Sequence, residues 1–193
     1  MSGQRTERAV DPEVERIYCQ GEPFRLFLSR DAIATRVQEL GQRLEADYRG
    51  LTPVLIGALN GSFMFLADLI RCLSIDCEID FLKLSSYGAR KVSAGHVVEL
   101  KKIDARLQGR HVIVVEDVVD TGVSVQFILN RLRDHEPASL RVVTLLRKPD
   151  AIRVPVALDY VGFDIPDRFV IGYGLDYGQL GRNLPDIHIL DES

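Results

Sequence analysis

The sequence predicts an α/β protein, because runs typical of buried strands are followed by segments with helical spacing. Residues 111–115 form a short β-branched apolar run after a glycine, as expected for a central strand buried on both faces. Residues 119–132 then place apolar side chains three or four positions apart, so the strand passes into a helix near Gly122. Residues 53–59 form a second buried strand, which ends in a small-residue turn before a predicted helix at residues 63–73.

The other predicted elements fit the same class. Residues 24–28 alternate apolar and polar side chains in the manner of an edge strand, and Ser29 can cap the helix that follows. That helix covers residues 30–49 and carries an apolar stripe that ends at Gly50. The stripe consists of Ile33, Val37, Leu40, Leu44 and Tyr48. Further strands are predicted at residues 77–84, 96–100 and 140–146, the first two of which form a hairpin.

Length and composition indicate an ordinary globular protein. At 193 residues the chain can bury a sizeable core, and we expect one domain over residues 1–193. Residues 1–16 carry no convincing core stripe and are expected to form a mobile N-terminus. Hydrophobic residues make up 46% and charged residues 27%, which excludes a disordered chain. Since no apolar run reaches transmembrane length and no secretory signal is present, we expect a cytoplasmic protein with no membrane partner.

Cysteine, histidine and charge content exclude several kinds of site. The three cysteines form no CxxC pair and no histidine-containing metal spacing, which indicates reduced thiols rather than zinc ligands. The four histidines are scattered, and we interpret all of them as surface or structural residues. A formal net charge of -4 and a pI near 5.6 argue against a general nucleic-acid binder. A phosphorylated substrate would then need Mg²⁺ to mask its charge.

An unusual cluster of side chains follows the strand at residues 111–115. It consists of Glu116, Asp117, Asp120, Thr121, Gly122 and Ser124. Its three carboxylates fall within five residues and would repel one another, whereas its small residues and the first N–H groups of the helix form an anion cradle. A ligand with both a sugar and a phosphate explains the combination, because carboxylates accept hydrogen bonds from ribose hydroxyls. An acidic solvated loop after a core strand is the alternative.

A strand, then Glu-Asp-x-x-Asp-Thr-Gly-x-Ser, then a helix resembles the phosphoribosyl pyrophosphate motif of the type I phosphoribosyltransferases. The resemblance covers residues 24–190 through five motifs in the family's order. It implies a central, mostly parallel, twisted sheet flanked by helices, a small hood formed by the chain ends, and a flexible β-hairpin loop. It also implies that Glu116 and Asp117 hold the ribose hydroxyls. The residues implied to cradle the 5-phosphate are Thr121, Gly122, Val123 and Ser124.

A second motif follows the strand at residues 53–59. The run Leu-Ile-Gly-Ala-Leu-Asn-Gly-Ser-Phe-Met-Phe resembles the pyrophosphate loop of the hypoxanthine-guanine phosphoribosyltransferases within that family. By this resemblance, Asn60 and Gly61 bind phosphoribosyl pyrophosphate through backbone N–H groups. Asn60 departs from the pattern, because many members carry Lys or Arg at this position.

A third motif lies in a polar stretch between two predicted strands. Ser86 and Tyr87 match the Ser-Tyr pair that opens the family's flexible loop over the active site. Closure of such a loop would exclude water from a reactive sugar cation. Composition alone favours a plain surface loop here.

The fourth motif concerns the choice of base. Leu145-Leu146-Arg147-Lys148 matches the family pattern Leu-Leu-x-Lys, in which the lysine reaches the 6-oxo group of the purine. An ammonium has three donors and no acceptor, so it suits a carbonyl and is a poor match for the amino group of adenine. A lone lysine at a strand end is otherwise usually solvated.

The fifth motif, at residues 161–177, matches the family's purine and metal segment. By that resemblance Phe169 stacks on the base, and the backbone of Val170 meets its edge. Asp176 lies at the base and faces Mg²⁺ together with Glu116 and Asp117, and Arg182 reaches pyrophosphate. Packing of strands and turns explains the same spacing equally well.

Taken as a set, the motifs imply a purine salvage enzyme that joins N9 of hypoxanthine or guanine to C1 of phosphoribosyl pyrophosphate and releases pyrophosphate. Asp120 is the implied general base, near N7 of the purine. Two rivals are a regulator of the same fold that binds nucleic acid, and a transferase for uracil or orotate. The acidic pI opposes the first, and Lys148 and Phe169 oppose both. The ranking of hypoxanthine, guanine and xanthine stays open, and the family implies a homodimer or homotetramer.

Overall fold

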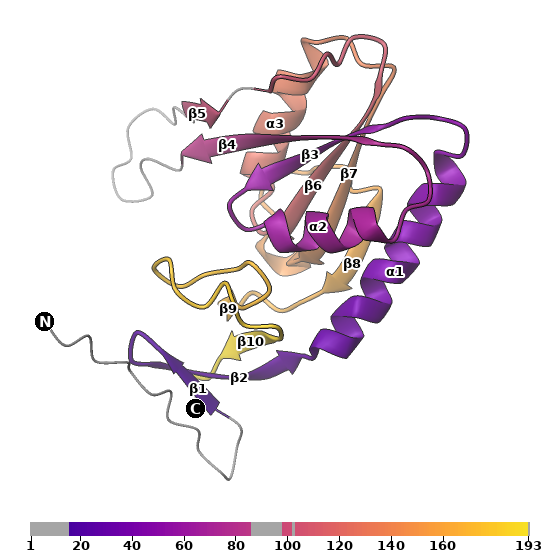
Figure 1. Ribbon diagram of the computed structural model, residues 1–193. Helices are drawn as coiled ribbons and strands as arrows, with labels where there is room; N and C mark the ends of the chain where they lie inside the picture. The colour runs from indigo at the N-terminus through magenta and orange to yellow at the C-terminus, as the bar shows by residue number, and fades with distance from the viewer. Residues whose placement is uncertain (1–15, 86–97, 102, 193) are drawn as a thin grey trace, which may run out of the picture. The chain divides into compact units, whose positions relative to one another are not determined.

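The computed structural model describes residues 16–85, 98–101 and 103–192, and Figure 1 shows their helices and strands. The chain forms two compact units, whose division falls inside the first helix. The terminal unit contains both chain ends, up to Ile33 and from Arg168, and the sheet unit contains residues 34–167. Residues 1–15 lie outside the described part, as do the predicted loop residues Ser86 and Tyr87. A single domain over residues 1–193 stays a prediction.

The sheet unit is built on a six-stranded sheet with the order β5-β4-β3-β6-β7-β8. Five neighbouring strands are parallel, and only β5 at one edge is antiparallel. The strands are β3 (Val54–Leu59), β4 (Glu78–Ser85), β5 (Val98–Lys101), β6 (His111–Val119), β7 (Ser139–Arg147) and β8 (Tyr160–Asp164). The predicted central strand is β6, which lies between β3 and β7, and the predicted hairpin is β4 with β5.

Helices cover both faces of this sheet (Figure 1). They are α1 (Arg30–Asp47), α2 (Phe63–Arg71) and α3 (Val123–Arg133), with a short 3₁₀ turn, η1, at Pro149–Ala151. Val112 and Val114 of β6 pack in one cluster with Ile128 of α3. On the other face, a Cβ added to Gly57 would lie 2.8 Å from a methyl of Leu66, so α2 packs directly on β3. The predicted α/β class with a mostly parallel, helix-flanked sheet is confirmed.

Helix α1 follows its predicted apolar stripe closely. All five residues of the stripe are at most 3% exposed. The hydroxyl of Ser29 accepts a hydrogen bond from the N–H of Ala32 at 3.2 Å, which confirms the predicted cap. Gly50, at φ +75°, takes the chain away from the helix end.

The terminal unit is a four-stranded antiparallel sheet with the order β1-β2-β10-β9. Its strands are β1 (Arg16–Cys19), β2 (Glu22–Leu28), β9 (Val170–Ile171) and β10 (Ile187–Leu190). Cys19, Phe24, Ile171 and Leu184 form its core. Its strands come from both ends of the chain, as predicted, and two other predictions are corrected here. Strand β2 is not an edge strand, because β1 and β10 pair with it on either side, and Arg16 is not part of a mobile tail, because it begins β1.

Strand β6 is longer than predicted. The apolar run ends at Val115, but the ladder continues to Val119, where Glu116 pairs with Thr144 and Val119 with Arg147 of β7. Backbone hydrogen bonds therefore extend the strand through Glu116 and Asp117 to Val119, beyond its first apolar run. As a result Glu116 and Asp117 belong to a strand and not to the loop after it.

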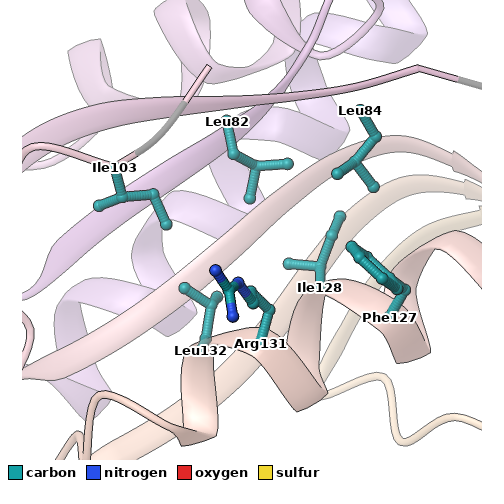
Figure 2. Close-up of a pocket in the computed structure, with 7 residues that line it drawn as sticks. All are labelled: Leu82, Leu84, Ile103, Phe127, Ile128, Arg131 and Leu132. Carbon is teal, nitrogen blue, oxygen red and sulfur yellow. The ribbon is translucent and has the colours of Figure 1, made fainter. Parts of the chain in front are cut away.

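A small apolar hollow lies between β4 and α3 (Figure 2). Leu82, Leu84 and Ile103 line one side, and Ile128 and Leu132 line the other. Its volume of about 10 Å³ is at the lower limit for one water molecule, and it offers few polar partners. Among the described residues, no helix has the length and apolar character needed to span a membrane.

Candidate active site

Three adjacent parallel strands deliver the predicted site segments to one edge of the sheet. Strand β3 pairs with β6, and β6 pairs with β7, so their carboxyl ends lie side by side. Gly61, just after β3, packs on the carboxylate of Asp117 in β6 so closely that an added Cβ would overlap it. The two motifs predicted to bind phosphoribosyl pyrophosphate therefore touch, and Gly61 must lack a side chain for them to do so.

The connection from β6 to α3 is braced by a neighbouring loop. The carbonyl oxygen of Thr121 accepts hydrogen bonds from the N–H groups of Arg153 and Val154, both at 3.0 Å. Gly122 caps α3 at φ +82°, and a Cβ there would overlap the carbonyl oxygen of Val154. Val123 and Ser124 are exposed at the start of the helix. The first N–H groups of a helix have no partner within it, so this end can receive an anion.

Glu116 and Asp117 form an acidic pair at the end of β6. Glu116 is only 8% exposed. Burial, and then the charge of the neighbouring Asp117, raise the pKa of Glu116 well above its ordinary value. A bound cation would relieve this repulsion. The part of the chain that the structure describes holds no group of three or more His, Cys, Asp or Glu side chains placed to bind a metal ion. The two adjacent carboxylates of Glu116 and Asp117 are donors of the kind that Mg²⁺ uses, together with water and substrate oxygens.

Lys148 lies between two carboxylates. Its Nζ is 3.0 Å from Oδ2 of Asp120 and 3.5 Å from Oδ1 of Asp167, and its side chain is 9% exposed. The N–H of Lys148 donates to the carbonyl oxygen of Val119 at 3.0 Å, which keeps the residue beside β6 after β7 has ended. Two predicted residues, Asp120 and Lys148, are thus brought into contact. Asp167 was not predicted, because a distance of nineteen positions along the sequence gives no signal of this contact.

The turn after β3 depends on a buried serine. Ser62 is fully buried, and its hydroxyl donates to the carbonyl oxygen of Ala58 at 2.7 Å. The carbonyl oxygen of Ser62 in turn accepts from the N–H of Leu66 at 2.8 Å. Asn60, whose preceding peptide bond is cis, is exposed. The small residues of this motif thus shape the turn, and Asn60 and Gly61 lie where the chain leaves the strand.

The remaining predicted residues belong to the terminal unit. Phe169 is 45% exposed, and its ring makes an edge contact with Tyr177 at 5.2 Å between centroids. Val170 is buried in β9, where it pairs with Ile189 of β10. Tyr177 was predicted only as part of the segment at residues 161–177, without a role of its own.

Asp176 and Arg182 interact with each other. A guanidinium nitrogen of Arg182 lies 2.7 Å from Oδ1 of Asp176, and another donates to the carbonyl oxygen of Gly174 at 2.7 Å. The second carboxylate oxygen of Asp176 accepts from the N–H of Gln179 at 2.8 Å. The structure therefore brings together one of the three residues predicted to face Mg²⁺ and the residue predicted to reach pyrophosphate.

Comparison with known families defines the class of protein. Residues 27–178 match the family described as Phosphoribosyl transferase domain. This match covers most of the chain and includes the two phosphate motifs and Lys148. The chain belongs to the phosphoribosyltransferase family.

Similar proteins narrow the class further. The chain is 39% identical over 166 residues to the hypoxanthine-guanine phosphoribosyltransferase of Bacillus subtilis, covering 86% of this chain and 92% of that protein. It is 40% identical over 193 residues to the enzyme of the same name from Mycobacterium tuberculosis, covering 97% and 96%. A crystal structure of a hypoxanthine-guanine phosphoribosyltransferase from Bacillus anthracis matches with a TM-score of 0.82 and 42% identity, covering 86% and 98%.

Proposed function

We propose that this protein is a hypoxanthine-guanine phosphoribosyltransferase of purine salvage. It would transfer the 5-phosphoribosyl group from phosphoribosyl pyrophosphate to N9 of hypoxanthine or guanine, which forms the nucleoside monophosphate and pyrophosphate. The observation that carries the proposal is the contact of Lys148 with Asp120, immediately before the exposed N-terminus of α3. This contact puts a donor for a purine carbonyl next to an acceptor for a purine N–H. The similar proteins named above support the same activity.

The phosphoribosyl group would be held by the segment at the end of β6. Residues 121–124, with the first N–H groups of α3, would receive the 5-phosphate without a basic side chain. Glu116 and Asp117 would accept hydrogen bonds from the ribose hydroxyls. Asn60 and Gly61 would receive the pyrophosphate through backbone N–H groups, and Gly61 already touches Asp117. In the terminal unit, Arg182 would add a positive charge for the same pyrophosphate.

The purine would be selected by Lys148. The ammonium has three donors, of which two face Asp120 and Asp167, so one remains for the 6-oxo group of hypoxanthine or guanine. Adenine presents a donor at that position and would leave the lysine unmatched. Phe169 would stack on the base, and the backbone of Val170 would meet its edge.

Asp120 would hold the proton that the purine loses as its N9 attacks the ribose. A carboxylate near N7 also stabilises the positive charge that develops on the reacting groups. The contact with Lys148 keeps this carboxylate oriented before the base binds. Ser86 and Tyr87 would open the loop that excludes water, as the family resemblance implies.

Mg²⁺ would be held by Glu116, Asp117 and Asp176 together with substrate oxygens, and when bound it would neutralise and orient the leaving pyrophosphate. The raised pKa of Glu116 supports a cation at this edge of the sheet.

The test is a panel of bases with release of pyrophosphate as the readout. Hypoxanthine and guanine should be turned over with phosphoribosyl pyrophosphate and Mg²⁺, xanthine should be ranked against them, and adenine, uracil and orotate should react poorly. Robust turnover of uracil or orotate without hypoxanthine would contradict the proposal. Nucleic-acid binding without turnover of any base would favour a regulator on this fold.

We further propose that the protein is a cytoplasmic homodimer or homotetramer, with no nucleic-acid or membrane partner. The family resemblance supports the oligomer, and a net charge of -4 supports the absence of nucleic acid. Light scattering after size-exclusion chromatography measures the oligomer directly. A monomer at assay concentrations would contradict this part of the proposal.

A further inference from the structure

The backbone around Asp176 adopts an unusual conformation. Six residues between positions 172 and 181 have positive φ angles, and two of these residues, Tyr173 and Gln179, are not glycine. Tyr177 and Leu180 exchange backbone hydrogen bonds at 2.9 and 3.1 Å, and close a two-residue turn in which both Gly178 and Gln179 have positive φ. A backbone of this kind persists only where surrounding groups support it.

Support from within the turn comes from Asp176. Its Oδ2 accepts the N–H of Gln179, and its Oδ1 pairs with Arg182. The carbonyl oxygen of Tyr177 accepts the N–H of Leu180 within the turn, and since a carbonyl oxygen has two lone pairs, those of Tyr177 and Gly178 can also accept donors from outside it. A group that donates to these two carbonyl oxygens, here called the outer side of the turn, can restrain the turn and with it the bond from Gln179 to Asp176.

The outer side is held by Gln20. This residue lies at the tip between β1 and β2, itself at φ +52°. Its side-chain Nε2 donates to the carbonyl oxygen of Tyr177 at 3.0 Å and to that of Gly178 at 3.1 Å. A primary amide has two N–H hydrogens, so one nitrogen can serve both acceptors. A Cβ on Gly178 would overlap the amide of Gln20, so a side chain at this position would displace that amide from the two carbonyl oxygens.

Tyr177, whose carbonyl oxygen accepts a hydrogen bond from Gln20, also contacts two aromatic rings. The ring of Tyr177 makes edge contacts with Phe169 at 5.2 Å and with Phe24 of β2 at 6.0 Å. Fixing the carbonyl of Tyr177 therefore restrains the residue that supports Phe169. One amide at the hairpin tip thus acts on both parts of the terminal unit that carry predicted site residues.

We infer that Gln20 is a positioning residue, which holds the turn at residues 177–180 so that Asp176 and Arg182 keep their orientation and Tyr177 supports Phe169. Gln20 does not itself touch the reacting groups. What the turn binds, phosphoribosyl pyrophosphate with Mg²⁺ and a purine, rests on the proposed function. That Gln20 fixes the turn rests on the contacts alone.

Two substitutions test this inference. Gln20→Asn keeps an amide and tolerates positive φ, but it is one methylene too short to reach both carbonyl oxygens. Gln20→Glu keeps the length but has no donors and faces two acceptors. Glu22→Gln, an exposed change on the same hairpin, is the matched control. We expect both Gln20 variants to raise the KM for phosphoribosyl pyrophosphate about 3- to 10-fold, the loss of one or two hydrogen bonds, with kcat within about twofold.

A second measurement separates this inference from the proposed function. Hydrogen exchange of the Gln179 amide, followed by NMR, reports its bond to Asp176 without any substrate. We expect faster exchange at Gln179 in both Gln20 variants, with an unchanged Tm, and wild-type exchange in Glu22→Gln. If wild type turns over no base, the proposed function fails while the exchange still tests the positioning role.

Several results would overturn the inference. Unchanged exchange at Gln179 in Gln20→Asn would do so, and so would faster exchange with an unchanged KM. A lower Tm and a lower kcat with wild-type KM values would indicate a merely structural residue. If Gln20→Glu does not fold, Gln20→Asn decides the question by the same criteria.

Discussion

The six-stranded sheet has carboxylates at both ends of its strands, here called the carboxyl edge and the amino edge, and their surroundings differ. At the carboxyl edge, Glu116 is buried beside Asp117, and burial and then the charge of Asp117 raise the pKa of Glu116. At the amino edge, the carboxylate of Asp47 accepts hydrogen bonds from the hydroxyl of Tyr160 at 2.5 Å and from Arg141 at 2.8 Å. The ionised form of Glu116 is therefore disfavoured and would be stabilised by a bound cation or donor. The carboxylate of Asp47 already has its hydrogen-bond donors within the protein.

The pKa directions show the same contrast. The hydrogen bond from Tyr160 lowers the pKa of Asp47, burial opposes the shift, and the bond from Arg141 lowers the pKa further. Burial and Asp117 raise the pKa of Glu116. In a charge network that stabilises the fold, other protein groups stabilise the ionised side chains. In a binding site, part of that stabilisation comes only when the ligand binds. The amino edge therefore serves stability, and the carboxyl edge is the candidate for function.

The largest expected effect is the loss of kcat on substitution of Asp120. Asp120→Asn should lower kcat by about 10²- to 10⁴-fold, the usual loss for a general base, with a smaller change in the KM values. Steady-state kinetics with hypoxanthine measures it, and a Tm near that of wild type excludes misfolding. Turnover at the wild-type rate would remove Asp120 from the mechanism.

At the opposite edge, Tyr160→Phe should affect stability and leave catalysis alone. The substitution removes the hydroxyl that donates to Asp47 and accepts from Arg141, so the free energy of unfolding should fall by about 1–2 kcal/mol. Urea denaturation gives this value, and kcat/KM for hypoxanthine should stay within about twofold of wild type. A large loss of kcat/KM in this variant would break the distinction between the two edges.

The smallest expected effect is a gain in stability, where Tyr160→Phe gives a loss. Glu116→Gln removes a buried carboxylate whose pKa is raised, so at neutral pH it should raise Tm by about 2–4 °C, roughly 1 kcal/mol, while weakening binding of phosphoribosyl pyrophosphate. Calorimetry of the two proteins measures the difference, with Glu22→Gln as the control for a surface change. A lower Tm for Glu116→Gln would show that the charge of Glu116 is satisfied in the fold.

The pH dependence of that difference follows from the direction of the shift. Because folding raises the pKa of Glu116 above its ordinary value of 4.5, the folded state binds the proton more tightly than the unfolded state. The penalty in wild type is complete above the folded pKa, and it declines as the pH falls from there toward 4.5. The advantage of Glu116→Gln should therefore shrink over this range. An advantage that grows at low pH would contradict the assignment.

Much of the fold could be predicted because its signals are local. The apolar stripe of α1, its cap at Ser29, and the buried runs of β3 and β7 each depend on neighbouring residues, and all were confirmed. The predicted end of β6 was wrong because the polar Glu116 and Asp117 interrupt the apolar run, although the backbone continues to pair with β7 as far as Val119. The prediction that β2 is an edge strand was wrong, because its partner β10 lies some 160 residues away in the sequence and leaves no local signal.

The candidate site shows the same limit. Residues in contiguous motifs were identified by type and order, and the structure brings Gly61 to Asp117 and Lys148 to Asp120. The contact of Asp167 with Lys148 had no local signal, because it joins separate segments through an ion pair. The hydrogen bonds from Gln20 had none either, since a polar residue in a hairpin turn is common. Roles for Phe169, Val170, Ser86 and Tyr87 stay predictions from the resemblance.

The proposed preference for 6-oxopurines depends most on Lys148, the group that would donate a hydrogen bond to the purine carbonyl. The direct measurement is the ratio of kcat/KM for hypoxanthine to that for adenine, in wild type, in Lys148→Met and in the control Asp167→Asn, which keeps the lysine. We expect Lys148→Met to lower the ratio by about 10- to 100-fold, the worth of a hydrogen bond from a charged donor, and Asp167→Asn to leave it within about threefold of wild type. A wild-type ratio in Lys148→Met would contradict the role of Lys148 in selecting the purine.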